Sequence, residues 1–330
     1  MIKKNEFIWN MIGSFIYAMF SAIILAICTR ANSIEIAGIF SIAYATSCIL
    51  NAIGDFGIRI YQVTDTNRKY TFSEYLSARI IAILIMVVFS IIFVVISGYS
   101  STKLAICLIL VLYRVIDNLS ETYQAEFQMN NRLDIAGKSM VLRNSIAIII
   151  FAIFDIITHN IVVASILMTI ANLIIFILYD MKKIKKFNSD KIKIKIKEAK
   201  DIVKDCFPMA IASILNVYVI NAVKYAIDSK GDNTMQTYFN IIYMPTFVIN
   251  LVSIFIIKPF LKTFGDYWNG GEHQKLFATL LKIIGALVAI TVIIELGCYI
   301  LGIPVLSWFY GVDISLYKME LMILIISGLL

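Results

Sequence analysis

Long apolar stretches recur along the whole chain, and short segments with charged and turn-forming residues separate them. A stretch of roughly 20 apolar residues is long enough to cross a hydrocarbon core of about 30 Å as an α-helix. The stretches are continuous, whereas the strands of a membrane β-barrel alternate apolar and polar positions. Because a backbone in lipid must satisfy its own hydrogen bonds, the pattern predicts a bundle of transmembrane helices.

The pattern predicts nine complete spans and the beginning of a tenth near Leu316. The first run is too long for the core of a cleaved signal peptide, so it is interpreted as an uncleaved span. Only about 13 apolar residues remain at the end of the chain, fewer than the roughly 17 that a crossing needs, so we expect a truncated chain. The complete spans are predicted at residues 7–29, 34–58, 75–97, 103–127, 140–158, 161–179, 206–227, 238–261 and 276–300.

The composition agrees with a membrane protein, since 60% of the residues are hydrophobic and 15% are charged. The net charge is +7. With Lys3 and Lys4 in the cytosol, most Lys and Arg residues fall in inward loops, Arg59, Arg143 and the 182–204 cluster among them. This is the positive-inside arrangement of a multi-pass protein with a cytoplasmic N-terminus. It accounts for the positive charge, so nucleic acid is not an expected partner.

The most polar segment, DKIKIKIKEAKDIVKD at residues 190–205, separates the first six spans from the later ones. Lys and Ile alternate at its start, but a longer helical stripe is formed by Ile192, Ile196, Ala199, Val203 and Phe207. We therefore expect an amphipathic helix on the anionic lipids of the inner leaflet, with a bend at Pro208. A solvated linker is the alternative. The predicted organisation is a six-helix lobe over 1–180, a basic linker over 181–205 and a partial second lobe over 206–330.

Polar residues inside the predicted spans fall on helical faces. Because ionisable groups are costly at mid-membrane, they usually face a protein interior or a water-filled cavity. The sequence therefore predicts one wet cavity between several helices. The residues that define these faces are Asn10, Ser14, Tyr17 and Ser21 in the first span, Tyr44, Ser47, Asn51 and Asp55 in the second, Arg114, Asp117, Glu121, Gln124 and Gln128 in the fourth, and Asn221, Lys224 and Asp228 in the seventh.

Three cations, Arg79, Arg114 and Lys224, are candidates to attract an anionic substrate into this cavity. A guanidinium binds phosphate oxygens through two parallel hydrogen bonds, whereas an ammonium acts as a point charge. The alternative is neutralisation within the chain, because Asp117 and Asp228 lie three and four residues beyond Arg114 and Lys224. Arg79 lies near an inner end, where its side chain can extend to the membrane surface instead.

Catalytic and metal motifs are not found in the sequence. The two histidines, His159 and His273, fall on opposite predicted sides of the membrane, and the five cysteines have neither CxxC nor His-paired spacing. We therefore expect a protein that is not an enzyme and that needs no cofactor or metal.

Three segments carry a resemblance to a known family: GDFGIRIYQVTD with YTFSEYLSARI, PMAIASILNVYVINAVKYAID, and GVDISLYKMELMILIISGLL. The chain resembles, over its whole length, the Wzx-type polysaccharide flippases of the multidrug/oligosaccharidyl-lipid/polysaccharide (MOP) exporter superfamily. The resemblance implies an all-α membrane fold with two pseudo-symmetric six-helix lobes in a V around a cationic cavity. The second lobe departs from it, since it ends after about four helices.

The resemblance implies transport of an undecaprenyl-pyrophosphate-linked oligosaccharide from the inner to the outer leaflet of a bacterial cytoplasmic membrane. The product would be a surface polysaccharide such as O-antigen, capsule or a teichoic-type polymer, and glycan-assembly proteins would be partners. By position, the matching segments contain Arg59, Arg79, Asn221, Lys224 and Asp228. Arg114, Asp117, Glu121, Asn51 and Asp55 depend on the helical faces alone.

Two other functions are considered. A cation-coupled multidrug exporter of the same superfamily would favour a carboxylate-lined pocket, whereas the buried charges here include Arg and Lys. An integral-membrane glycan polymerase or ligase would carry a large outward loop with clustered His, Arg or Asp, and the predicted outward loops are short.

Overall fold

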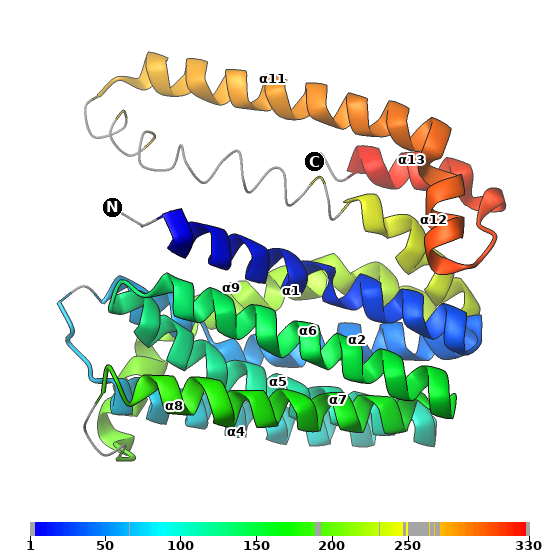
Figure 1. The fold of residues 1–330 in the computed structure, drawn as a ribbon. Coiled ribbons are helices and arrows are strands. Elements are labelled where there is room, and N and C mark those ends of the chain that lie inside the picture. Colours follow the sequence, from blue (N-terminus) through cyan, green and yellow to red (C-terminus); the bar gives the residue numbers. More distant parts are fainter. Residues whose placement is uncertain are drawn as a thin grey trace. The chain divides into compact units, whose positions relative to one another are not determined.

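The computed structural model describes residues 4–65, 67–188, 193–230, 232–246 and 271–327, together with residues 249, 264 and 267. These residues form helices and short connections, without a β-strand among them (Figure 1). The long helices are α1 Lys4–Ala31, α2 Ile34–Asp55, α4 Phe72–Ser97, α5 Ser101–Met129, α6 Leu133–Thr158, α7 Ile161–Ile175, α9 Ile196–Asp228 and α11 His273–Gly297. The shorter ones are α3 Ile58–Thr64, α8 Met181–Ile184, α12 Ile303–Tyr310 and α13 Lys318–Ser327.

Seven helical stretches of the described chain are long and apolar enough to cross a membrane. The protein is therefore a multi-pass membrane protein, and the all-α class expected from the sequence is confirmed. The seven are Ile8–Ala31, Ile34–Asp55, Phe72–Ser97, Leu133–Thr158, Ile161–Ile184, Ile196–Asp228 and His273–Tyr310. The predicted eighth span lies mostly outside the described residues, although 238–246 are helical.

The chain forms two compact units, Met1–Gln236 and Thr237–Leu330. The second unit contains α11, α12 and α13, and its Tyr238 and Tyr317 rings lie 4.9 Å apart. The division into lobes over 1–180 and 206–330 stays a prediction. The first unit holds every candidate residue.

Helix α5 lies in the interior of the first unit, where it packs against α2, α3, α4, α6 and α7. It is 29 residues long but is missing from the seven apolar stretches, because it carries many polar side chains. The neighbouring helices separate these side chains from lipid. Helix α1 packs against α6 and α2, and α9 packs against α2 and α4.

Helix α4 shows how the lipid-facing side of this unit differs from the interior. The side chains of Leu84, Val88, Ile91 and Val95 are exposed, and they recur along one face of the helix. The opposite face buries the smaller Ala78, Ala82 and Ser90 together with Met86. Small residues at helix contacts and large apolar residues outside are typical of membrane bundles.

Two predicted elements differ from the structure at the end of the second span. One helix was expected over 34–58, but α2 ends at Asp55 and α3 begins at Ile58. The backbone between them is left-handed at Phe56 (φ 51°) and Gly57 (φ 71°). A left-handed residue ends a helix because it turns the chain away from the helical hydrogen-bond pattern.

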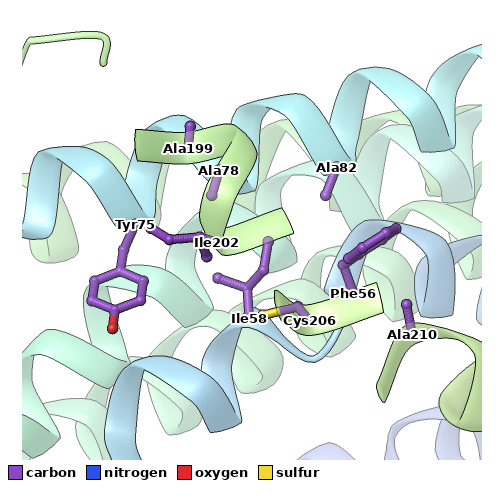
Figure 2. Close-up of a cluster of buried hydrophobic side chains, with 9 residues drawn as sticks. All are labelled: Phe56, Ile58, Tyr75, Ala78, Ala82, Ala199, Ile202, Cys206 and Ala210. Carbon is purple, nitrogen blue, oxygen red and sulfur yellow. The ribbon is translucent and has the colours of Figure 1, made fainter. Parts of the chain in front are cut away.

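The apolar stripe predicted after residue 190 is correct in part: Ala199 is buried and Val203 packs on the same cluster, but Ile196 and Phe207 are exposed. Helix α9 continues through Pro208, and the bend expected there stays a prediction. Ile192 lies outside the described residues. The buried face is instead Ala199, Ile202, Cys206 and Ala210, which packs on Phe56, Ile58, Tyr75, Ala78 and Ala82 (Figure 2). Packing of these side chains against α3 and α4 selects the buried face.

The loop between α3 and α4 is held by the Asp65 carboxylate. It accepts hydrogen bonds from the backbone N–H groups of Lys69 (2.9 Å) and Tyr70 (3.1 Å) and from the Tyr75 hydroxyl (2.8 Å). Partial burial by itself raises the pKa of Asp65, but the three donors outweigh it and the pKa lies below its ordinary value. The charged form of Asp65 therefore stabilises this loop.

Helices α1 and α6 approach closely at two glycines. A Cβ added at Gly137 would lie 2.5 Å from the backbone nitrogen of Asn10, and one at Gly13 would lie 2.8 Å from the carbonyl oxygen of Gly137. Each glycine therefore sits where even a methyl group would collide with the neighbouring backbone.

We expect Gly137→Ala to lower the free energy of unfolding by about 1–3 kcal/mol, because α1 must move away from α6. Thermal unfolding of the detergent-solubilised protein measures the change. Gly285→Ala in α11 is the matched control, since nothing lies within 4 Å of a Cβ placed there. Equal stability of the two variants would contradict the close approach.

We expect Asp65→Asn to destabilise the protein by about 1–2 kcal/mol at pH 7, where the carboxylate is charged. Because the folded pKa is depressed, this contribution is present above the ordinary pKa of about 4 and is lost as the pH falls below it. The difference in melting temperature between wild type and variant should therefore shrink between pH 7 and pH 3.5. A difference that is independent of pH would count against the assignment.

Candidate functional site

The polar face of α5 lies in the interior of the first unit. Arg114, Asp117 and Gln124 are buried, and Glu121 and Gln128 are partly buried. Polar residues on the other sides of α5, including Asn118 and Thr122, are buried as well. Polar groups therefore surround this helix, and the neighbouring helices supply their partners.

Arg79 of α4 is fully buried, with 0% of its surface exposed. Its Nη1 donates to the carbonyl oxygens of Gly54 (2.9 Å) and Asp55 (2.8 Å) at the end of α2. It also donates to Oδ1 of Asn118 (3.0 Å), while Nε donates to Oγ1 of Thr122 (3.0 Å). The guanidinium thus caps the carbonyl end of α2 and connects α2 to α5. It does not extend to the membrane surface.

Two acidic side chains lie near the Arg79 guanidinium. The Asp55 Oδ1 atom is 3.3 Å from Nη1, and the Glu121 Oε2 atom is 3.9 Å from Nη2. Arg59 approaches the other Glu121 oxygen at 4.0 Å, and both side chains are about a quarter exposed. Asn51 accepts a hydrogen bond of 2.8 Å from Asn118 Nδ2, which places it in the same network.

Arg114 forms the ion pair with Asp117 that the sequence offered as the alternative to substrate binding. Its Nη1 lies 3.3 Å from Asp117 Oδ2 and donates to the Tyr17 hydroxyl at 3.3 Å. The guanidinium also lies 4.9 Å from the ring centre of Tyr44, a cation–π contact. Nη2 donates to the Cys48 sulfur at 3.3 Å. Arg114 therefore connects α5 to α1 and α2.

Asp117 is shared between two arginines. Its second oxygen, Oδ1, accepts a short hydrogen bond from Arg143 Nη2, and Arg143 Nε donates to Asn172 Oδ1 at 2.7 Å. Arg143 is buried in α6, and Asn172 is buried in α7. One carboxylate thus lies between two buried guanidinium groups, and a second buried carboxylate, Asp180, lies within electrostatic range of Arg143.

Arg143 was placed in an inward loop by the sequence, which is wrong. Arg143 lies inside the span predicted from residue 140 but near its start, whereas the structure begins α6 at Leu133 and buries the Arg143 side chain ten residues into the helix. Its small neighbours one turn away, Ser139 and Ala147, are buried on the same face. These three residues are spaced four apart, and this helical spacing is the sequence signal that could have identified an arginine facing the protein interior.

Lys224 of α9 is 7% exposed, as is Asn221 one turn earlier. The pairing of Lys224 with Asp228 is not found, because Asp228 instead pairs with Lys103 Nζ at 2.5 Å. Within the described chain, Lys224 Nζ forms neither a hydrogen bond nor an ion pair. Lys224 lies within electrostatic range of Cys48, the side chain that accepts from Arg114.

The candidate residues of the first unit thus fall into two groups. A connected network includes Asn51, Asp55, Arg59, Arg79, Arg114, Asp117 and Glu121, together with Arg143, which the sequence did not single out. Lys224 and Asn221 lie outside it, and Asp228 belongs to a separate pair with Lys103. With Asp180, which is fully buried and within electrostatic range of Arg143, this network holds four arginines and four carboxylates, so its charges balance.

The described helices resemble solved membrane transporters over most of the chain. One is a multidrug resistance MATE family transporter of the MOP superfamily in an outward-facing conformation. It superposes with a TM-score of 0.59 at 14% sequence identity, and the match covers 96% of this chain and 75% of the transporter chain. A MATE transporter in complex with MaL6 gives 0.58 at 14% identity over 97% and 78%. The chain has the fold of a MATE transporter.

A MOP superfamily transporter from Pyrococcus furiosus, described as having a binding pocket of reversed polarity, has a TM-score of 0.50 at 14% identity, covering 98% of this chain and 76% of its own. Among curated proteins, the capsular polysaccharide biosynthesis protein CapF of Staphylococcus aureus is 26% identical over 217 residues, which is 65% of this chain. The match spans about half of that relative, 53% of its length. No family model matches the sequence.

We expect Asp117→Asn to destabilise the protein by about 3 kcal/mol, because it leaves two buried guanidinium groups without their shared carboxylate. Arg143→Gln should cost less in the Asp117→Asn background than in wild type, since the two side chains form one unit. Thermal unfolding of the two single variants and the double variant gives this coupling. Additive effects would contradict the shared carboxylate.

Proposed function

We propose that the protein moves a lipid-linked oligosaccharide, joined to its lipid through pyrophosphate, across the bacterial cytoplasmic membrane. The observation that carries the proposal is Lys224, a buried cation without a counter-ion in the described chain. A desolvated ammonium without a partner is costly, and an anion that arrives during transport would remove this cost. The pyrophosphate of the substrate is such an anion.

The fold and the relatives support a transporter of this class. The MATE-like fold belongs to proteins that carry substrates through a membrane, and the relative CapF is named for capsular polysaccharide biosynthesis. An oligosaccharide cannot cross lipid unaided, whereas the lipid tail can remain in the bilayer while the head group passes along a polar interior. Glycan-assembly proteins remain expected partners.

In this proposal, some cations stabilise the fold and others contact the substrate. Arg79 and Arg114 direct most of their donors to the chain itself, so they position the helices. Lys224 and the partly exposed Arg59 are the groups that contact pyrophosphate oxygens. Asn221 and Asn51 are polar neighbours suited to the sugar, and Asp55, Asp117, Glu121 and Asp228 balance the charge or take part in ion coupling. Transport would proceed by alternating access to this polar side.

Cation-coupled multidrug export is the second candidate function. The solved MATE proteins of similar fold include a multidrug resistance transporter, and Glu121 is a partly exposed carboxylate in the network. A transporter of this kind would bind an organic cation at Glu121 or Asp55. It would gain nothing from the cation at Lys224, because like charges repel.

We expect Lys224→Gln to reduce transport at least tenfold in proteoliposomes that contain the full chain and a fluorescent undecaprenyl-pyrophosphate-linked oligosaccharide. Lys224→Arg should retain part of the activity, because the charge remains. Lys230→Gln is the matched control, since Lys230 is exposed in the turn after the same helix.

The same vesicles loaded with rhodamine 6G test the second function. Transport of this cationic dye that depends on Glu121 but not on Lys224 would assign the protein to drug export. Oligosaccharide transport by Lys224→Gln at the wild-type rate, at equal protein levels, would overturn the proposal.

A further inference from the structure

A cavity of about 600 Å³ lies at the end of the first unit where α4 and α9 begin and α5 ends. It lies beyond the polar network, and by the predicted topology it opens on the cytoplasmic side. Its wall includes the cations Arg68, Lys193 and Lys195, the acid Glu126, and the rings of Phe72 and Phe187. Neither the expected transport site nor the comparisons assign this cavity.

The single acid of this wall is already satisfied. Glu126 is buried, and its Oε1 accepts from Asn130 Nδ2 at 2.9 Å and from Arg68 Nη1 at 3.4 Å. Arg68 Nη2 donates to Asn130 Oδ1 at 3.0 Å, which fixes the guanidinium at the edge of the cavity. About half of the Arg68 side chain remains exposed to a ligand.

The two lysines are held in place by the start of α4. The backbone N–H of Lys193 donates to Ser73 Oγ at 3.5 Å, and that of Lys195 donates to Ser77 Oγ at 3.0 Å. The Lys195 ammonium pairs with Glu74 at 2.8 Å. Lys193 is exposed, and its ammonium has no carboxylate within ion-pair distance among the described residues. Lys193 is therefore the cation that is available for an anion.

The two rings of the cavity wall pack against other aromatic rings of the first unit. The Phe72 ring packs edge-on against Tyr123, with ring centres 5.1 Å apart, and the Phe187 ring packs against Phe127 at 5.7 Å. Aromatic rings beside a cationic rim suit an amphiphilic head group, because the phosphate meets the cations and the adjoining glycerol or sugar carbons meet the rings.

We propose that this cavity binds the phosphate head group of a lipid at the cytoplasmic surface of the membrane. Lys193 and Arg68 contact the phosphate oxygens, and Phe72 and Phe187 contact the less polar part. Two sources share this chemistry, an anionic phospholipid of the bilayer and the pyrophosphate of a lipid-linked substrate. Only the second source rests on the proposed function.

The test uses the full chain in a neutral detergent with inorganic pyrophosphate as the probe, titrated by isothermal calorimetry at low salt. Lys193→Gln/Lys195→Gln should weaken binding about tenfold. The matched control Lys197→Gln/Lys200→Gln removes two exposed lysines from the first turns of α9 that do not line the cavity, and it should bind like wild type. Lys193→Gln alone keeps the Lys195–Glu74 ion pair and should still weaken pyrophosphate binding about threefold. This single variant therefore tests the site even if the double variant folds poorly.

Equal loss in the double variant and its control would overturn the site, because it would reduce the effect to diffuse surface charge. Undiminished binding in Lys193→Gln would also overturn it. Native mass spectrometry of protein from nanodiscs with phosphatidylglycerol and added undecaprenyl pyrophosphate then identifies the source. Retention of either lipid by wild type, with loss in Lys193→Gln, supports the site, and retention of neither overturns it. Because this readout involves no transport, failure of oligosaccharide transport leaves it unaffected.

Discussion

The structure of the first unit depends on keeping the charged groups of α5 away from lipid. An ionised side chain in hydrocarbon is stable only when protein groups replace its lost water. Five helices supply these groups, through Tyr17 of α1, Cys48 of α2, Arg59 of α3, Arg79 of α4 and Arg143 of α6. The contact faces of the bundle are therefore specified by polar partners as well as by small residues. In a membrane, apolar burial alone gives little preference for one helix arrangement over another.

Neutralisation within the chain separates structural cations from those that remain available. Arg79, Arg114 and Arg143 each meet several acceptors, and removing one of them would leave a buried acid or carbonyl group unpaired. Lys224 Nζ has no such acceptor among the described residues. A cation that forms no ion pair within the protein is available to a ligand. Pairing distinguishes Lys224 from the three arginines, whereas burial does not, because all four side chains are buried.

The sequence predicted correctly those features that depend on a single helix. The spans of 17 or more apolar residues and the polar face of α5 follow from the periodicity of a single segment. The partners do not, because they depend on which helices meet: the Lys224–Asp228 pair was excluded by Lys103, 125 residues away from Asp228. The face of α9 was misjudged in part for the same reason, since Ala199 and Cys206 fit against α4 better than the larger Ile196 and Phe207. The break after α2 was signalled only by Gly57, because the left-handed residue before it, Phe56, is of a type that rarely adopts this backbone conformation.

The cations are also distributed in depth. At 1.5 Å per residue, Arg79 lies roughly 10 Å along α4 from its start. Lys224 lies deeper, near Cys48, which is seven residues before the end of α2 that Arg79 caps. Arg114 lies roughly 20 Å along α5 from the opposite end. For the proposed transport of a pyrophosphate-linked lipid, a single strong anion site would hold the substrate and stop transport, whereas several weak sites would let it enter and leave. Under that proposal, the partly neutralised arginines and the less neutralised Lys193 and Lys224 are such weak sites at different depths.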